Sequence, residues 1–245
     1  MKLIATVIFS IFLCLFCTAC SDKSEKESLI VGVSADNPPY EFIQNGQIVG
    51  FDIDLINAIG EKLGKKIVIK NFDFSGLLAA LISNNLDVAI SGLTVTEERE
   101  AHVSFSIPYM TTHVSILYRL EDSLHDVSDL QNKVIGVQLG TTWAIIAKDL
   151  ADKINIKINP LSNNLMLVEE LKAKVIDAII LEESQSQKFI ENNKGLASFP
   201  LQEFSSEFAI ALPKNSELIK DVNKAIEDLK EEGVLNKLKK KWIKQ

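Results

Sequence analysis

The chain has 245 residues, of which 47% are hydrophobic and 24% are charged, a composition typical of a globular protein with one large domain or two ordinary ones. Lys and Arg number 26 against 33 Asp and Glu, which gives a net charge of −7, and only Arg99 and Arg119 are arginines. Because nucleic-acid binding needs a concentrated cationic face, this balance argues against a nucleic-acid partner.

The first twenty residues have the pattern of an export signal. One cation, Lys2, precedes an uncharged and mostly apolar run over 3–19, which is at the lower limit of length for a membrane-spanning helix. The run ends in small residues before Cys20, as in the cleavage sites of bacterial lipoproteins, although Cys17 stands where such sites usually have Leu. We therefore expect a lipoprotein signal peptide over 1–19; an uncleaved anchor helix and an ordinary signal peptide are the alternatives.

The cysteines set the chemistry of the remainder. Cys20 is the expected lipidation site, with 20–28 as a flexible tether to the membrane. The three cysteines all lie before residue 21, so the rest of the sequence has no disulfide framework, no cysteine-based metal site and no cysteine nucleophile. We expect an exported protein of the periplasm or cell surface, lipid-anchored to the membrane.

Beyond residue 28, strand-like runs alternate with helical ones. Buried β-branched runs predict strands, and apolar residues at helical spacing predict helices. In chain order, the expected elements are strand 29–34, helix 51–63 stopped by Gly64, strand 66–71, helix 75–84, strand 86–91, strand 133–138, helix 142–152, strand 154–158, helix 164–174, strand 176–181, strand 208–212 and helices 216–232 and 234–243. This alternation predicts an α/β fold of βαβ units with mainly parallel sheets.

A near-repeat favours two lobes of similar construction. The segments 81–90 and 171–180 both run from a helix end through a turn and an Asp into a buried strand, although such junctions also recur in unrelated α/β proteins. Ligands of open α/β sheets bind beyond the carboxyl ends of the strands. Two facing lobes would therefore form a cleft lined by the residues that follow each strand.

The residues after the third expected strand offer a carboxylate site. Ser91, Gly92 and Thr94 provide hydroxyl groups and backbone that a ligand can approach, and Thr96 is a candidate N-cap of a short helix. Arg99, one turn into that helix, would reach back to the strand end as a bidentate partner of a carboxylate. The alternative for Arg99 is a surface ion pair with a neighbouring Glu.

The second half of the chain offers two complementary groups. Thr141 and Thr142 follow a Gly turn and open a helix, whose N-terminus favours an anion; ordinary capping is the alternative. Glu182, preferred over Glu183, comes directly after a strand, where an acid would pair with an ammonium; a solvated helix start is the alternative. A carboxylate clamp with one acid is typical of an amino-acid-binding site.

Motifs of other chemistries are missing from the sequence. The three histidines do not have metal-ligand spacing, and there is no nucleotide-binding glycine motif, Walker loop or nucleophile elbow. We therefore expect no metal, no cofactor and no catalytic residue. The pair Asp52 and Asp54 at a helix start is expected to stabilise the helix dipole.

Over about 29–243 the chain resembles the solute-binding proteins for polar amino acids that serve ABC importers. The segment around Phe74 and the one ending at Arg99 look closest to glutamine-binding members, and the segment at Thr141 looks closer to members that bind Lys, Arg and His. The motifs that carry the resemblance are Pro39-Tyr-Glu-Phe, Gly50-Phe-Asp-Ile-Asp-Leu, Asp73-Phe-Ser-Gly, Thr94-Val-Thr-Glu-Glu-Arg and Val137-Gln-Leu-Gly-Thr-Thr.

This resemblance implies a two-lobed clamshell of the type II periplasmic binding protein class, each lobe a mainly parallel sheet flanked by helices. Lobe 1 would comprise 29–112 and 208–245, and lobe 2 would comprise 113–207, with hinge crossovers near 110–114 and 203–208. The implied ligand contacts are stacking on Phe74, an α-carboxylate site of Ser91, Gly92, Thr94, Arg99, Thr141 and Thr142, and Glu182 on the α-ammonium, where the family usually has Asp.

The side chain of the ligand is harder to assign. The family's acid and aromatic after the first strand fall on Ser34 and Asn37, with Asp36 nearby in another register, and Gln138 lies at the rim. The resemblance implies a monomer that binds a polar or basic L-amino acid, arginine or lysine before glutamine, and delivers it to an ABC permease and its ATPase. The alternatives are a cyclohexadienyl or arogenate dehydratase-like enzyme on the same fold, and a sensory or adhesin lipoprotein.

Overall fold

The computed structural model of the chain describes residues 27–243. The expected signal peptide, the expected lipidation site Cys20 and most of the expected tether lie outside the described residues. No helix within 27–243 is long and apolar enough to cross a membrane.

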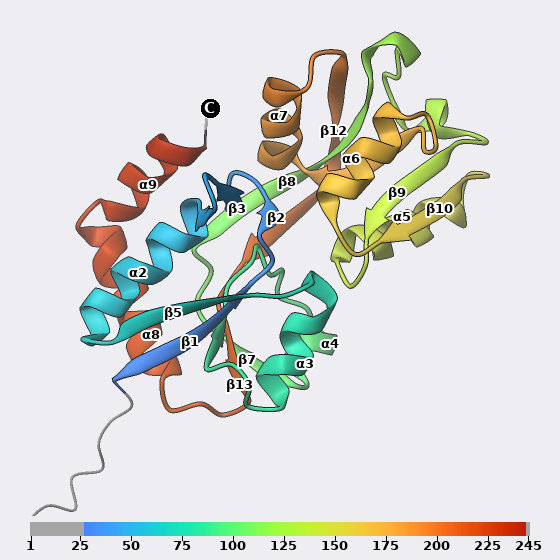
Figure 1. The fold of residues 1–245 in the computed structure, drawn as a ribbon. Helices are drawn as coiled ribbons and strands as arrows, with labels where there is room; N and C mark the ends of the chain where they lie inside the picture. Colours follow the sequence, from blue (N-terminus) through green and yellow to red (C-terminus); the bar gives the residue numbers. More distant parts are fainter. Residues whose placement is uncertain (1–26, 244–245) are drawn as a thin grey trace, which may run out of the picture.

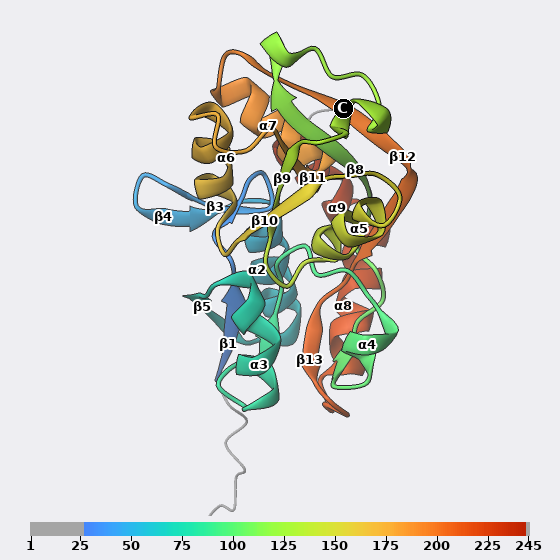
Figure 2. The same cartoon turned by 90° about the vertical axis from the view of Figure 1, so that its right-hand side faces the viewer.

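Two five-stranded sheets organise the protein (Figures 1 and 2). The first has the order β5-β1-β6-β13-β7, in which β1 is parallel to β5 and β6, and β13 is antiparallel to β6 and β7. Its strands are β1 (Ser28–Val33), β5 (Lys66–Asn71), β6 (Val88–Ala89), β7 (Val103–Phe105) and β13 (Ala211–Pro213). A three-stranded sheet of β2 (Asp36–Asn37), β3 (Glu41–Gln44) and β4 (Gln47–Val49) adjoins it in sequence.

The second five-stranded sheet has the order β10-β9-β11-β8-β12, with β9 parallel to β10 and β11 and with β8 antiparallel to both of its neighbours. Its strands are β8 (Met110–Arg119), β9 (Val134–Gln138), β10 (Lys157–Leu161), β11 (Ala178–Glu182) and β12 (Leu196–Phe208). The two sheets and their helices form the two lobes of an α/β clamshell, which confirms the expected fold class. The sheets are mixed and not mainly parallel as expected, because the connecting strands β8 and β12 and the late strand β13 pair antiparallel with their neighbours.

Helices flank both sheets (Figure 1). The first lobe carries the short 3₁₀ helix η1 (Phe74–Gly76), α2 (Phe51–Leu63), α3 (Leu77–Ile82), α4 (Glu97–Glu100), α8 (Ile219–Glu231) and α9 (Val234–Trp242). The second carries the 3₁₀ helices η2 (Leu120–Asp122) and η3 (Val127–Leu130) with α5 (Thr142–Ala151), α6 (Asn164–Lys172) and α7 (Glu183–Asn192). Helix α2 has the bounds expected from its apolar spacing and ends at Gly64, whose left-handed conformation is easy for glycine (φ 63°).

Three expected strands differ from the observed ones. The strand expected at 154–158 is β10, which starts at Lys157, because Ile154 and Ile156 bond within the preceding turn. The strand expected at 208–212 is β13, since Phe208 ends the longer strand β12. The strand expected at 86–91 is limited to the two residues of β6.

The strands β8 and β12 connect the lobes. They pair antiparallel from Phe208 opposite Met110 to Leu196 opposite Arg119, and the register shifts between Leu201 and Ser205. Figure 2 shows β12 running from the upper lobe down to β13 in the lower one. The expected hinge crossovers fall on these two strands, and the exact lobe boundaries stay a prediction.

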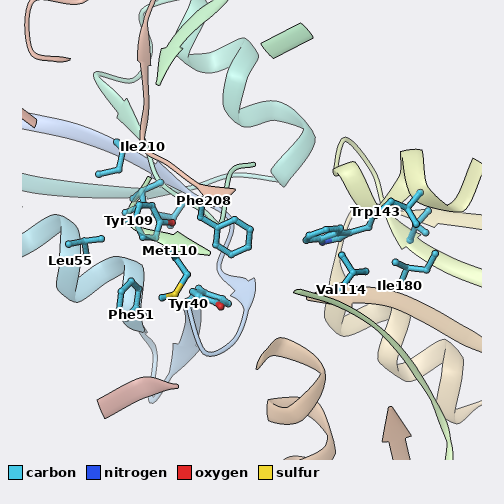
Figure 3. Packing of buried hydrophobic residues seen from close by; sticks show 14 of the residues in the cluster. Tyr40, Phe51, Leu55, Tyr109, Met110, Val114, Trp143, Ile180, Phe208 and Ile210 are labelled. Carbon is cyan, nitrogen blue, oxygen red and sulfur yellow. The ribbon is translucent and has the colours of Figure 1, made fainter. Parts of the chain in front are cut away.

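Aromatic residues pack where the first lobe meets the connecting strands. Tyr40 makes edge contacts with Phe51 and Phe208, at centroid distances of 6.2 and 5.4 Å, and Tyr109 stacks on Phe51 at 6.1 Å. All four rings are almost completely buried. Figure 3 shows this group facing Trp143 of the second lobe, and Phe208 is the ring of the group that lies nearest to Trp143. The packing gives the base of the cleft a rigid wall.

Candidate ligand-binding site

A cavity lies between the two lobes, lined by residues of both. The lining combines two hydroxyl-rich strand ends, three aromatic rings, four amides, one guanidinium and one carboxylate. The lining residues are Asn37, Phe74, Ser91, Gly92, Thr94, Arg99, Gln138, Thr141, Thr142, Trp143, Asn164, Glu182, Gln185 and Phe208.

Arg99 contributes a guanidinium that is held by backbone oxygens. Thr96 caps helix α4 by accepting from the Arg99 backbone N–H (3.3 Å), as its position predicts. Arg99 Nη1 donates to the Thr94 carbonyl (2.6 Å), and Nη2 donates to the Gly140 carbonyl of the other lobe (2.9 Å). Its Cζ also lies 5.7 Å from the centre of the Phe74 ring, within cation–π range.

The charge of Arg99 has no acidic partner in the described part of the chain. Ion pairs occur elsewhere among residues 27–243, but none involves this guanidinium. Burial lowers the pKa of Arg99 to about 10, against the opposing effect of Glu98, so the side chain remains a cation at neutral pH. A partly buried cation without an acid favours an anionic ligand group in the cavity.

Two buried carboxyl groups position the Ser91–Gly92 turn. Glu41 Oε1 accepts from Ser91 Oγ (2.7 Å) and Asn37 Nδ2 (2.9 Å). Asp52 Oδ2 accepts from the Gly92 backbone N–H (3.0 Å) and the Tyr109 hydroxyl (2.9 Å). Asp52 is therefore a support of the site and not only a first-turn residue of α2, which sequence reasoning did not anticipate.

These two carboxyls share one environment. Both side chains are fully buried, and they lie within hydrogen-bonding reach of each other. Burial, with the neighbouring carboxyl, raises the pKa of Glu41 well above its usual value, and burial raises the pKa of Asp52 to about 6. Glu41 Oε2 and Asp52 Oδ1 have no other donor among the described residues. The raised pKa values favour a proton on one of the two carboxyls, which that carboxyl would share with the other.

The second lobe presents the start of α5 to the cavity. Thr141 caps this helix by accepting from the Ala144 N–H (3.4 Å), and its own hydroxyl donates to the Gln138 carbonyl (2.7 Å). Thr142 is the first helical residue, and its hydroxyl lies 3.4 Å from that of Thr94 in the first lobe. The helix N-terminus and Arg99 thus border the same cavity from opposite lobes, an arrangement suited to an anion.

Glu182 is the acid of the cavity. It caps α7 through the Gln185 N–H (2.8 Å) and also accepts a hydrogen bond from the Thr112 hydroxyl on β8. Burial raises the pKa of Glu182, opposed by these hydrogen bonds. A cationic ligand group beside it would favour its ionised form.

Asp36 joins the lobes behind the cavity. Its Oδ1 accepts from Ser34 Oγ (2.9 Å), while its Oδ2 accepts from Gln138 Nε2 (2.9 Å) and from the backbone N–H of Asn164 (2.7 Å). Asp36 and Ser34 are both buried, at 3% exposure.

The cavity brings together ten of the eleven residues expected from the sequence. Ser34 is the exception, since it lies behind the lining and bonds Asp36. Sequence reasoning missed Trp143, Asn164, Gln185 and Phe208. The first three lie in the first turns of α5, α6 and α7, each of which follows a strand of the second lobe. A position directly after a strand end is the same signal that pointed to Thr141, Thr142 and Glu182. The ligand contacts of all these residues remain predictions.

The fold and the cavity between its lobes define a solute-binding protein of the clamshell class. A family model described as bacterial extracellular solute-binding proteins, family 3, matches residues 29–245. The chain belongs to this family, which confirms the resemblance inferred from its sequence motifs.

Individual relatives agree with this assignment. The arginine-binding extracellular protein ArtP of Bacillus subtilis (strain 168) is 36% identical over 234 residues, which cover 92% of each chain. An ancestral arginine-binding protein bound to arginine has a TM-score of 0.84 at 38% identity, covering 88% of this chain and 98% of that one. The ancestral amino-acid-binding protein AncCDT-1, a precursor of cyclohexadienyl dehydratase, has a TM-score of 0.83 at 32% identity, covering 89% and 96%. All three are named as binding proteins.

Proposed function

We propose that this protein binds a polar or basic L-amino acid between its lobes and delivers it to the permease and ATPase of an ABC importer. Arginine or lysine is the first candidate ligand and glutamine the second. The protein acts as a monomer outside the cytoplasm, tied to the membrane through a lipid on Cys20, and it does not transform its ligand.

The observation that carries this proposal is the guanidinium of Arg99, which lines the cavity and has no acidic partner among residues 27–243. The N–H groups of Arg99 that do not bond the Thr94 and Gly140 carbonyls, together with the N-terminus of α5, suit an α-carboxylate, and Glu182 suits the α-ammonium. The hydroxyl of Thr94 adds a neutral hydrogen bond, and the ring of Phe74 adds a face for stacking. These groups match the two charges that every amino acid carries.

The choice of a basic or amide side chain rests on two supports. The relatives described above include proteins named for binding arginine. The remaining lining is rich in amides, with Asn37, Gln138, Asn164 and Gln185 grouped in one cavity. Amide oxygens accept hydrogen bonds from a guanidinium, an ammonium or a carboxamide.

Closure of the lobes would follow from contacts to both. A ligand held only by one lobe gains nothing from closure, whereas a ligand that touches Arg99 and the start of α5 favours the closed form by its differential affinity. Expulsion of water then strengthens each charged contact. A membrane permease that recognises the closed form would therefore bind only the protein that carries its amino acid.

A thermal-shift screen of the twenty amino acids tests the proposal. At a hundred times its dissociation constant a ligand stabilises the native state by about 2.7 kcal/mol, which is readily seen as a rise in Tm. We expect arginine, lysine or glutamine to give the largest rise. The absence of any rise with all twenty would refute amino-acid binding.

The similarity to AncCDT-1 and the raised pKa of Glu182 give a dehydratase-like enzyme a specific basis as a second candidate. On that hypothesis Glu182 would serve as a general acid. Consumption of a prephenate-like substrate by the purified protein, lost in Glu182→Gln, would favour the enzyme over the binding protein.

A further inference from the structure

The carboxylate of Asp36 sets the orientation of the amide of Gln138. Gln138 Nε2 donates one hydrogen to Asp36 Oδ2 (2.9 Å) and the other to the Ser162 carbonyl (3.1 Å). A flipped amide would place Oε1 against two acceptors and would lose both hydrogen bonds. Gln138 therefore has one allowed orientation, with Oε1 directed away from Asp36.

That orientation in turn fixes Asn164. Gln138 Oε1 accepts from Asn164 Nδ2 (2.9 Å), so the amide nitrogen of Asn164 must face Gln138. The backbone of Asn164 is held as well, because its N–H donates to Asp36 Oδ2 (2.7 Å) at the start of α6. The orientation passes from Asp36 through Gln138 to Asn164, and we call these three residues the amide relay.

The last atom of the amide relay is a free acceptor. Asn164 is only 2% exposed, and its Oδ1 is buried without a hydrogen-bond partner among the described residues. Asn164 also lines the cavity between the lobes. A buried acceptor without a donor costs free energy, which a donor on a bound molecule would recover.

We propose that Asn164 Oδ1 accepts a hydrogen bond from the side-chain end of the bound amino acid, so that the amide relay selects ligands ending in an N–H donor. This inference rests on the proposed function and narrows it. Guanidinium, ammonium and carboxamide ends fit, whereas the carboxylate of glutamate would place a second acceptor against Oδ1. Glu182, the acid of the lining, is assigned to the α-ammonium and does not make this selection.

Calorimetry with arginine, lysine, glutamine and glutamate tests the selection. Glutamine and glutamate have the same shape and differ at the end group alone. We expect the wild-type protein to bind glutamate at least about 100-fold more weakly than its best donor-ended ligand, since a site built around a hydrogen bond rejects an analogue that cannot form it. Comparable affinities for glutamate and the best ligand would overturn the inference.

Asn164→Ala removes the acceptor. Its best ligand should bind at least about tenfold more weakly, and the preference over glutamate should shrink. Asn155→Ala is the matched control, because that exposed amide of the same lobe bonds Asn132 and does not line the cavity. Equal preferences in Asn164→Ala and the control would overturn the inference.

Asp36→Ala tests the positioning role of the first member of the amide relay. This change frees the Gln138 amide to flip, so the preference over glutamate should narrow even though Asn164 is intact. If Asp36→Ala only removed a contact between the lobes, it would weaken the binding of all four ligands equally and leave the preference over glutamate unchanged. That result would count against a positioning role of Asp36. Wild-type protein that binds none of the four ligands would overturn the assignment of arginine, lysine or glutamine as the ligand, whereas failure with all twenty amino acids would refute the proposed function itself.

Discussion

Nη2 of Arg99 lies 2.9 Å from the carbonyl oxygen of Gly140, so a side chain of the first lobe donates a hydrogen bond to the backbone of the second. Nη1 is bonded within its own lobe, to the Thr94 carbonyl. The guanidinium therefore has two tasks in the arrangement described: it joins the lobes, and it brings a positive charge to the cavity. The first task depends on geometry and the second on charge, and substitutions separate them.

We expect Arg99→Ala to abolish measurable amino-acid binding while the far-ultraviolet circular dichroism stays that of the wild type. Arg99→Lys keeps the charge but loses the fork that reaches two carbonyls, so binding should weaken by about 10- to 100-fold. Titration calorimetry measures both. Undiminished affinity in Arg99→Ala would remove the basis of the carboxylate site.

The second arginine provides the contrast. Arg119 is 8% exposed, and its Nη1 donates to the carbonyls of Leu171 and Ile176 while its Nη2 pairs with Asp122 and Asp177. Arg119→Met should therefore lower the free energy of unfolding by about 3–5 kcal/mol, because it leaves buried acceptors unpaired. Protein that still folds should bind its ligand as the wild type does. A denaturant titration and a calorimetric titration together check this, and a selective loss of binding would contradict it.

Gly140 is expected to be needed for closure. Its φ of +80° already favours glycine, and a Cβ there would lie 3.0 Å from Ser75 Cα in the opposite lobe. The backbone strain of about 1 kcal/mol in Gly140→Ala affects the open and the closed form alike. The clash with Ser75 destabilises only the closed form, so ligand binding should weaken several-fold.

Gly195→Ala is the control for this substitution. Gly195 also has a positive φ (+93°), but nothing lies within 4 Å of its added Cβ. It should lose stability and keep its ligand affinity. Small-angle scattering with saturating ligand should show incomplete compaction for Gly140→Ala only. Equal affinities in the two variants would show that Gly140 does not control closure.

The buried pair of Glu41 and Asp52 predicts a pH dependence of stability. Because burial raises the pKa of Asp52 to about 6, the folded protein holds its proton more tightly than the unfolded chain, whose Asp pKa is about 3.9. The contribution of this group is therefore complete below about pH 4 and is lost as the pH rises through 6. The other titratable groups that interact with the pair of Glu41 and Asp52 are the buried hydroxyls of Tyr40 and Tyr109, and the pKa of each is raised by burial.

Asp52→Asn is designed to remove this dependence. The amide oxygen can keep the hydrogen bonds from Gly92 and Tyr109, and the amide N–H can replace the shared proton toward Glu41. We expect the free energy of unfolding of the wild type to fall by on the order of 2 kcal/mol more than that of the variant between pH 4.5 and 7.5. Parallel pH profiles in urea titrations would contradict the role of the pair.

Sequence patterns predicted the parts of the fold that depend on neighbouring residues. The bounds of α2 and the cap at Thr96 follow from spacing and side-chain chemistry within a few positions. The strands β8 and β12 were expected only as crossovers, because their ladder joins Met110 to Phe208, about a hundred residues later. A two-residue alternation cannot reveal a partner so distant in sequence.

The candidate site shows the same division. The residues after strand ends, such as Ser91 and Glu182, could be proposed from their position in the chain. Asp36 could not be assigned, because its partners Gln138 and Asn164 are 102 and 128 residues away and belong to the other lobe. Trp143 reads as an ordinary core residue of a helix start until the lobes come together.

The place of β13 has a consequence for biosynthesis. This strand lies between β6 and β7 in the interior of the first sheet, although it is made after every strand of the second sheet. A chain that emerges with its N-terminus first can complete the second sheet while the first still lacks its inner strand. Loss of residues from 211 onward would consequently remove an inner strand of the first sheet, and this sheet cannot be completed during synthesis until β13 has emerged.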